Sequence, residues 1–409
     1  MTVRMTRTTL VAATAVALSV SLAAPALAAT PSEAGHDATH KAIEAAVDAG
    51  VPGVTATAKD GHRTWSVTAG VGNLKTGKPR SADDRYRVGS ITKTFVATVL
   101  LQLEAEGRLS LDDSVEKWLP GLVRGNGHDG SRVTLRQLLN HTSGIFNYTT
   151  DDDFGRTYFL KDGFFDHRYD THRPEELVTL AMTHKPDFEP GTSWKYSNTN
   201  FVLAGMVIEK VTGRPYGDAI RARIIEPLHL TATSVPGTRV TVPGPSSRAY
   251  SKLAETATGP TYDVTKINPS LAHAAGEMIS DSTDLGRFYT ALLRGRLLPR
   301  EQLAEMTTTV PLSETIAYGL GLMKAKLSCG VTVWGHGGGI HGSISEAITT
   351  ADGRKSLAFN FNGDWSGDTG AVTEAEFCGT EQGRAGSRAG MDPERRVGSG
   401  VSFAPPRIG

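Results

Sequence analysis

Two residues three positions apart form the first candidate for chemistry in this sequence. Ser90 and Lys93 make the pattern Ser-x-x-Lys directly after Gly89, at the start of a predicted helix over residues 90–106. Residues i and i+3 share a helix face, so the lysine amine can approach the serine hydroxyl, and the helix N-terminus favours developing negative charge. A serine beside a base is a nucleophile that can be acylated. Ser90 is therefore the predicted nucleophile.

A second copy of this pattern, Ser114-Val115-Glu116-Lys117, shows that the motif alone is weak. It follows two aspartates and precedes a tryptophan, which is typical of a capped surface helix. The surrounding motifs must decide between the two serines.

The triplet Tyr196-Ser197-Asn198 is a rarer pattern and precedes a predicted helix. A tyrosine with two cations nearby can exist as phenolate or share its proton, and so serve as base toward serine and acid toward a leaving group. Asn198 could orient an amide or ester carbonyl while contacting Lys93. Taken alone, the triplet also fits a loop tyrosine followed by helix-capping residues.

The third motif is the run Gly335-His336-Gly337-Gly338-Gly339, which follows the β-like segment 331–334. Several glycines in a strand indicate that a ligand's backbone approaches closely. A backbone N–H of this run, together with that of Ser90, would form an oxyanion hole, and His336 could donate a hydrogen bond near Tyr196. The alternative is a glycine-rich turn with an incidental histidine.

Composition and absent motifs narrow the function classes. The 409 residues include 43 Lys+Arg and 43 Asp+Glu, so the zero formal charge argues against a nucleic-acid partner. With 39% hydrophobic residues, the chain can bury a large core. Neither Gly-x-Ser-x-Gly nor His-Glu-x-x-His occurs, which disfavours an α/β-hydrolase elbow and a zinc hydrolase. No metal or cofactor is predicted.

The elements that must position these motifs follow from hydrophobic periodicity. Besides the helix over 90–106, helices are predicted over 37–49, 135–139, 201–211, 283–293 and 372–378, and strands over 54–59, 64–71, 316–327, 331–334, 343–350 and 356–361. Hairpin turns are expected at Asp60-Gly61 and Asp352-Gly353. Because strands lie at both ends and helices between them, we expect an α+β fold, with one antiparallel sheet built from both chain ends and a helical insertion. The α/β part would cover about 37–110 and 270–379, and the helical part about 111–269.

The N-terminal segment predicts export, and export bears on the state of the two cysteines. Residues 1–28 have the charged start, apolar stretch and Ala-x-Ala end of a signal peptide, which is too short for a membrane span. We therefore expect a secreted protein without stable membrane insertion, with Cys329 and Cys378 joined as a disulfide. Residues 381–409 lack apolar periodicity and are expected to be a disordered or processed tail.

Taken together, the three motifs resemble the penicillin-recognising serine hydrolases, which include serine β-lactamases, D,D-peptidases and related esterases. The resemblance covers about residues 37–380 and is closest to the secreted, soluble D-alanyl-D-alanine carboxypeptidases. It rests on the runs Arg87-Val88-Gly89-Ser90, Tyr196-Ser197-Asn198-Thr199-Asn200-Phe201, Tyr318-Gly319-Leu320-Gly321-Leu322 and Ser328-Cys329-Gly330.

The resemblance implies a β-lactamase-like fold and a role for each site residue. Ser90 would be the acylated nucleophile, and Lys93 and Tyr196 would handle its proton. The substrate would be bound by Asn198, His336, Gly338 and Gly339, with the N–H groups of Ser90 and Gly339 as the oxyanion donors. The implied substrate is a peptide or ester small molecule, with β-lactams as covalent inhibitors of a monomeric enzyme. His141, near the end of a predicted helix, is interpreted as a structural residue.

One feature departs from the carboxypeptidase branch. That branch carries an arginine after the Tyr-Gly-Leu-Gly-Leu run and Thr or Ser in the His-x-Gly strand, to bind the terminal carboxylate of the peptide. This sequence has Met323, Gly337 and Gly339 there, and strand alternation predicts that Lys324 and Lys326 point away from the face of Met323. Three functions therefore stay open: a D-alanyl-D-alanine carboxypeptidase, an esterase or amidase of the same chemistry, and a non-catalytic binding module.

Overall fold

The computed structural model describes residues 36–379. The predicted signal peptide and the predicted tail lie outside these residues. None of the helices within 36–379 combines the length and the apolar character needed to cross a membrane.

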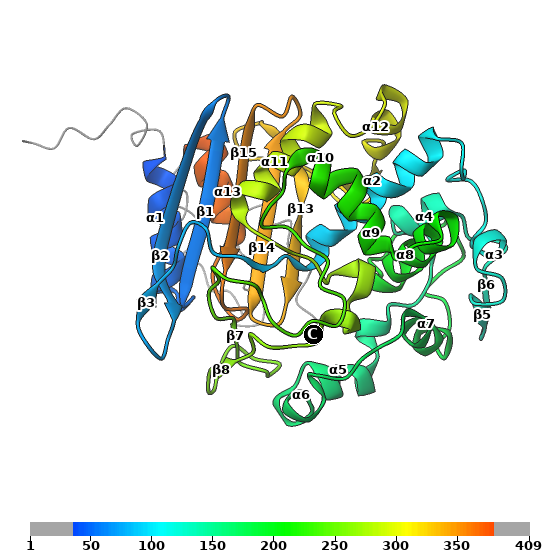
Figure 1. The fold of residues 1–409 in the computed structure, drawn as a ribbon, viewed down its shortest axis with the longest axis horizontal. Helices are drawn as coiled ribbons and strands as arrows, with labels where there is room; N and C mark the ends of the chain where they lie inside the picture. The colour runs from blue at the N-terminus through cyan, green and yellow to red at the C-terminus, as the bar shows by residue number, and fades with distance from the viewer. Residues whose placement is uncertain (1–35, 380–409) are drawn as a thin grey trace, which may run out of the picture.

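A single nine-stranded sheet forms one half of the molecule, with the strand order β10-β11-β12-β13-β14-β15-β1-β2-β3 (Figure 1). Its strands are β1 (Gly53–Asp60), β2 (Arg63–Asn73), β3 (Lys78–Pro79), β10 (Val310–Pro311), β11 (Ile316–Tyr318), β12 (Met323–Lys326), β13 (Thr332–Ile340), β14 (Ser343–Thr350) and β15 (Lys355–Phe361). All neighbouring pairs are antiparallel, and β1 from the N-terminal part pairs with β15 from the C-terminal part. The predicted sheet from both chain ends is confirmed.

The β1–β2 hairpin turns one residue later than predicted. Asp60 pairs with Arg63, so the two loop residues are Gly61 and His62. Gly61 has a φ of 58°, in the left-handed region that glycine adopts without steric cost. The glycine therefore sets the turn, and Asp60 ends the strand.

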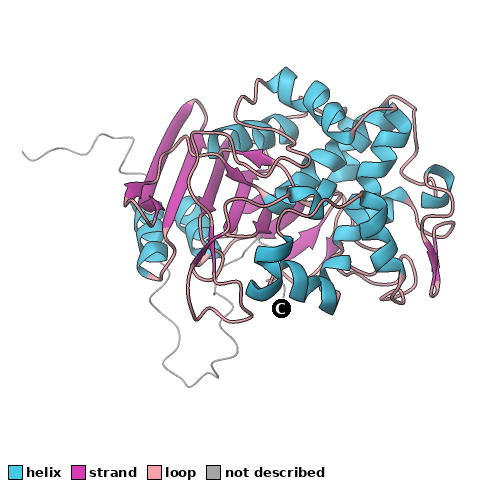
Figure 2. Cartoon of the chain, turned by 60° about the horizontal axis from the view of Figure 1, so that its bottom comes forward, coloured by secondary structure: helices cyan, strands magenta, loops and turns pink. Residues whose placement is uncertain are grey.

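Helices cover both faces of the sheet (Figure 2). Helices α1 (Asp37–Asp48) and α13 (Thr369–Cys378) pack over one apolar cluster, which includes Ile43, Val54 and Val372. Helix α11 (Ser282–Leu293) packs on β1, β14 and β15 from the other side. The inner strands β1, β14 and β15 are buried between these two layers, as an α+β fold requires.

The second half of the molecule is mainly helical and surrounds α2 (Thr92–Ala105) (Figure 1). Its other helices are α3 (Val115–Trp118), α4 (Leu135–Leu139), α5 (Asp152–Tyr158), α6 (Lys161–His167), α7 (Pro174–Met182), α8 (Asn198–Thr212), α9 (Tyr216–Ile220), α10 (Glu226–Leu228) and α12 (Arg300–Met306), with the short strand pairs β4 (Tyr86–Arg87) and β9 (Ile279–Ser280), and β5 (Arg124–Gly125) and β6 (His128–Asp129). A further short pair, β7 (Tyr250–Ser251) and β8 (Tyr262–Asp263), lies at the end of the sheet (Figure 1), where the Tyr250 backbone N–H donates to the Asn362 carbonyl oxygen at 3.0 Å. The predicted apolar face of α2, including Phe95 and Val99, is buried, and so are Ala97 and Leu101 on other sides. Helix α2 is thus a central helix of the core, which holds its first turn rigidly.

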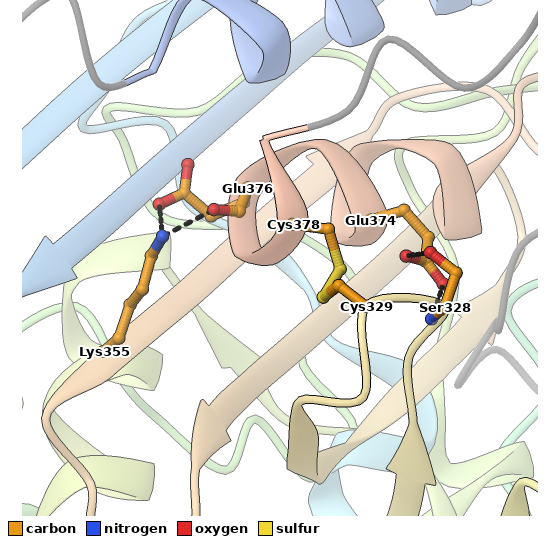
Figure 3. Close-up of a disulfide and its surroundings, with 6 residues drawn as sticks. All are labelled: Ser328, Cys329, Lys355, Glu374, Glu376 and Cys378. Carbon is orange, nitrogen blue, oxygen red and sulfur yellow. Dashed lines mark hydrogen bonds and ion pairs between the residues drawn. A yellow bond between two sulfur atoms is a disulfide. The ribbon is translucent and has the colours of Figure 1, made fainter.

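The predicted disulfide between Cys329 and Cys378 is present and joins the loop after β12 to the end of α13 (Figure 3). The Ser328 hydroxyl donates a hydrogen bond of 2.7 Å to Glu374 on the same helix. On the other side of the disulfide, Lys355 of β15 pairs with the Glu376 carboxylate at 3.5 Å. Three separate contacts therefore hold α13 on the sheet.

Candidate active site

Ser90 lies in a tight turn that precedes α2. A 3₁₀-helix spans Gly89–Ile91 and α2 begins at Thr92. The prediction that the α-helix starts at Ser90 is therefore wrong by two residues, and the serine lies in the 3₁₀ turn before it. Gly89 adopts a φ of 52°, which turns the chain sharply just before the serine. In a 3₁₀ turn residues i and i+3 eclipse one another, and this places Lys93 directly beside Ser90. Ser90 is 6% exposed and Lys93 is fully buried.

The glycine run lies in strand β13 rather than in a turn, and it packs against the Ser90 turn. A Cβ on Gly338 would lie 1.9 Å from the Val88 carbonyl oxygen and 2.8 Å from the Ser90 nitrogen, and one on Gly89 would lie 2.7 Å from the Gly339 nitrogen. The close approach predicted for a ligand's backbone is thus made by the chain's own backbone. Glycine is required here because any side chain would push the nucleophile away from the strand.

The Lys93 amine sits at the centre of three polar atoms. Its Nζ lies 2.9 Å from Ser90 Oγ, 2.8 Å from Asn198 Oδ1 and 2.7 Å from the Ala275 carbonyl oxygen. Burial lowers the pKa of Lys93 well below its ordinary value. A neutral amine has two N–H donors, which match the two oxygens that can only accept, and one lone pair, which is left for the Ser90 hydroxyl.

Asn198 begins helix α8 and is held by the loop that precedes α5. Its backbone N–H donates to Asn147 Oδ1 at 3.0 Å, and its Nδ2 donates to Thr149 Oγ1 at 3.1 Å. The predicted contact with Lys93 uses the remaining side-chain oxygen. One N–H of the amide group is then left over to face a substrate carbonyl.

Tyr196 places a buried hydroxyl next to Ser90 and Lys93. Its ring is partly exposed, but within residues 36–379 its hydroxyl oxygen has no well-formed hydrogen bond. Lys93 Nζ lies 4.8 Å from the ring centroid. Burial raises the pKa of Tyr196 above its ordinary value, and the nearby Ser90 hydroxyl offsets only part of this effect. The predicted phenolate is therefore disfavoured, and Tyr196 rests as a neutral phenol.

His336, which was predicted to donate a charged or a neutral hydrogen bond near Tyr196, is neutral. Burial, and then the proximity of Lys93, lower its pKa to about 3. Its Nε2 lies 2.9 Å from the Tyr318 hydroxyl, which in turn lies 3.2 Å from His141 Nε2. His336 is therefore part of a buried chain of three rings behind Tyr196, since the His141 ring centroid lies 4.3 Å from that of Tyr196.

The two ends of this chain determine where its protons lie. His141 Nδ1 accepts the Ser197 backbone N–H at 3.2 Å, so its proton is on Nε2 and is donated to the Tyr318 oxygen. At the other end, His336 Nδ1 faces the Gly337 carbonyl oxygen, which can only accept, so His336 Nε2 accepts the Tyr318 O–H. Both ends therefore require that the hydrogen bonds run from His141 through Tyr318 to His336. With both histidines neutral, every donor and acceptor of this three-ring chain has a partner.

Sequence reasoning missed part of this arrangement. His141 does follow helix α4, with a φ of 62°, but it also holds the Tyr196 segment through Ser197. Tyr318 was noticed only as part of a motif, and the Ala275 carbonyl carries no signal in the sequence. By contrast, Ser114 is the N-cap of α3 and accepts the Lys117 backbone N–H, as predicted.

In strand β12, Met323 and Lys324 point to opposite faces of the sheet, as strand alternation predicted. Met323 pairs with Gly335 and packs with the apolar cluster beneath α1 and α13, while Lys324 pairs with Trp334. Trp334 and His336 are two positions apart, so it is Lys324 that shares the sheet face of His336. The expectation that Met323 marks the substrate side of the strand is therefore wrong. The Lys324 Nζ lies 5.5 Å from the centroid of the Trp334 ring.

Comparison with known proteins agrees with this geometry. A family model described as Beta-lactamase matches residues 39–375. The chain is 65% identical to a D-stereospecific amidohydrolase from Streptomyces sp., with a TM-score of 0.81 over 84% of this chain and 99% of that one. It is 31% identical to the D-amino acid amidase of Ochrobactrum anthropi SV3, with a TM-score of 0.69 over 80% of this chain and 91% of that one. It is also 28% identical to Penicillin-binding protein 4* of Bacillus subtilis over 332 residues, which make up 76% of this chain and 68% of the relative.

Proposed function

Because the chain belongs to the Beta-lactamase family of serine hydrolases, we propose that it hydrolyses amides of D-amino acids or of short D-peptides through an acyl-enzyme on Ser90. The Streptomyces relative, whose name gives D-stereospecific amide hydrolysis, supports this substrate class over the D-alanyl-D-alanine carboxypeptidase that the motifs suggested. The amidase from Ochrobactrum anthropi supports it as well. The proposed enzyme is exported, through the predicted signal peptide, and is acylated by β-lactams.

The observation that carries the proposal is the arrangement around Lys93. Lys93 Nζ lies within 2.9 Å of Ser90 Oγ, Asn198 Oδ1 and the Ala275 carbonyl oxygen, and burial lowers its pKa well below the ordinary value, which favours the neutral amine. When the neutral amine directs its two N–H groups to Asn198 and Ala275, its lone pair faces the Ser90 hydroxyl. The lysine is thus a general base already within hydrogen-bond reach of the proton that it removes. A non-catalytic binding module would gain nothing from burying an uncharged lysine against a serine.

The reaction follows from these protonation states. Lys93 takes the Ser90 proton while Oγ forms a bond to the substrate carbonyl carbon, and backbone N–H groups of Ser90 and Gly339 stabilise the oxyanion. The neutral Tyr196 phenol donates its proton to the leaving amide nitrogen as the C–N bond breaks, and Lys93 then returns a proton to Tyr196. Water attacks the acyl-enzyme with the same groups in reverse, which releases the acid and regenerates Ser90.

A comparison of matched substrates tests the proposal. Turnover is measured for D- and L-amino acid amides of the same side chain, for a short-chain ester, and for a D-alanyl-D-alanine peptide as the free acid and as the amide. We expect the D-amide to exceed the L-amide by at least about 100-fold, a difference of about 2.7 kcal/mol in barrier. Equal rates for the two enantiomers would contradict D-specificity, and a faster ester with no amide turnover would favour the esterase.

The same experiment tests the missing carboxylate clamp. We expect the free acid to be favoured over the peptide amide by less than about tenfold, which corresponds to 1.4 kcal/mol. A larger preference would mean that another cation binds the carboxylate, and Lys324→Gln would then show whether it is Lys324. In all arms Ser90→Ala should abolish acyl-enzyme formation by mass, while Ser114→Ala should leave it intact.

A further inference from the structure

A cavity outside the Ser90 site collects positive charge. It has a volume of about 420 Å³ and lies between the tip of the β1–β2 hairpin, α10 and the second half of α11, and these two helices lie side by side in Figure 1. Its lining includes Lys59, His62, Arg287, Arg294 and Arg296, and no acidic side chain. None of these residues belongs to the Ser90 site.

Within residues 36–379, none of the four permanent cations of this cavity forms an ion pair with a carboxylate. Arg287 donates to the His229 carbonyl oxygen at 2.8 Å, and Arg294 Nε lies 3.4 Å from the Asp352 carbonyl oxygen. These contacts orient two guanidinium groups and leave their other N–H donors to a ligand. Four like charges around one cavity repel each other, and an anion would relieve this repulsion.

We infer that this cavity binds a compact ligand that carries two or more phosphate groups. Three arginines favour this class, because the planar guanidinium fork matches phosphate oxygens and stays charged at all relevant pH values. A single phosphate would leave some of the four charges unused. The inference does not depend on the proposed hydrolysis, since it rests on other residues.

Titration calorimetry of the full chain with tripolyphosphate tests the site. We expect saturable binding with one ligand per chain, weaker binding of inorganic phosphate, and weaker binding of citrate, a carboxylate anion of similar charge. Lys59→Gln and Arg296→Gln should each raise the Kd at least about tenfold, the effect of one lost charge-assisted hydrogen bond. Arg63→Gln is the matched control, because Arg63 is exposed on the same hairpin but does not line the cavity, and it should change the Kd less than twofold.

No binding of tripolyphosphate at 1 mM, roughly the limit of weak affinity, would overturn the inference. So would equal losses in Lys59→Gln and Arg63→Gln, which indicate non-specific attraction, or tighter binding of citrate, which excludes the phosphate class.

Discussion

At the scale of the residue, Tyr196 combines a buried hydroxyl with the lack of a well-formed hydrogen bond to any of the residues 36–379. Such a group can act only once a substrate supplies its partner. We predict that Tyr196→Phe lowers the acylation rate by at least about 100-fold, the usual contribution of a positioned proton donor. Stability should not fall, since the substitution leaves no other group unpaired. Stopped-flow acylation by a β-lactam, together with thermal melting, measures both effects, and acylation at the parental rate would reject the role of Tyr196.

Lys93 should leave a signature in the pH dependence of stability. Its pKa in the folded state is lowered below its unfolded value of about 10.4, so between these two values the unfolded chain binds more protons. Its contribution to the free energy of unfolding therefore rises with pH in this window, by up to about 1.4 kcal/mol per pH unit. Lys93→Met removes this contribution along with the activity.

Urea denaturation of both proteins at pH 7 and pH 9 measures this effect. The parental protein should gain stability relative to Lys93→Met at the higher pH. If the difference between the two proteins is the same at both values, Lys93 is charged in the folded state and is not the resting base.

At the scale of the element, the site depends on the contact between β13 and the turn before α2. Gly338→Ala places a Cβ 1.9 Å from the Val88 carbonyl oxygen, so the turn that carries Ser90 must move. Overpacking of this kind costs about 1–3 kcal/mol, and we predict a lower melting temperature with a loss of acylation of at least about 100-fold. Gly286→Ala in α11 is the control, because its nearest neighbour would be Ser356 Oγ at 3.5 Å. Parental acylation in Gly338→Ala would show that the turn can shift without harm.

The chain of three rings links β11, β13 and the end of α4. Tyr318→Phe removes the hydroxyl in its middle and leaves one nitrogen of each histidine unpaired, at a cost of about 1–3 kcal/mol each. We predict lower stability and a lower kcat, because His141 and His336 lose their fixed orientation next to Tyr196. Tyr289→Phe removes another buried hydroxyl, which contacts Thr94 and is not part of the three-ring chain. This variant should lower the stability and leave kcat unchanged. Equal kcat values in the two variants would mean that the chain is only structural.

At the scale of the whole molecule, the sheet closes the fold by pairing β1 with β15, and the disulfide supports the helix that covers this junction. Replacing Cys329 and Cys378 by serine frees a loop of about 48 residues, which costs roughly 4 kcal/mol by chain entropy. We predict a clearly lower melting temperature with unchanged acylation at 25 °C, because α13 contributes no residue to the Ser90 site. An activity loss at a temperature where the variant is fully folded would show that α13 also shapes the site.

Local patterns were enough for much of this protein. The i, i+3 spacing of Ser90 and Lys93, the rare Tyr196–Asn198 triplet and the glycines of β13 depend on neighbouring residues, so they could be recognised in the sequence. The alternation of apolar and polar residues predicted the strands at both chain ends, and hence the sheet. An even number of cysteines behind a predicted signal peptide was enough to predict the disulfide.

The chemical state of the site is decided only in the folded molecule. Burial, which no local pattern measures, lowers the pKa of Lys93 and of His336 and raises that of Tyr196, so it favours the uncharged form of all three groups. The Ala275 carbonyl lies 182 positions from Lys93 in sequence. In the three-ring chain, Tyr318 lies 18 positions from His336 and 177 positions from His141. Strand register likewise assigns Lys324, and not Met323, to the face of His336. Desolvation, long-range hydrogen bonds and register arise from packing, which brings distant segments together.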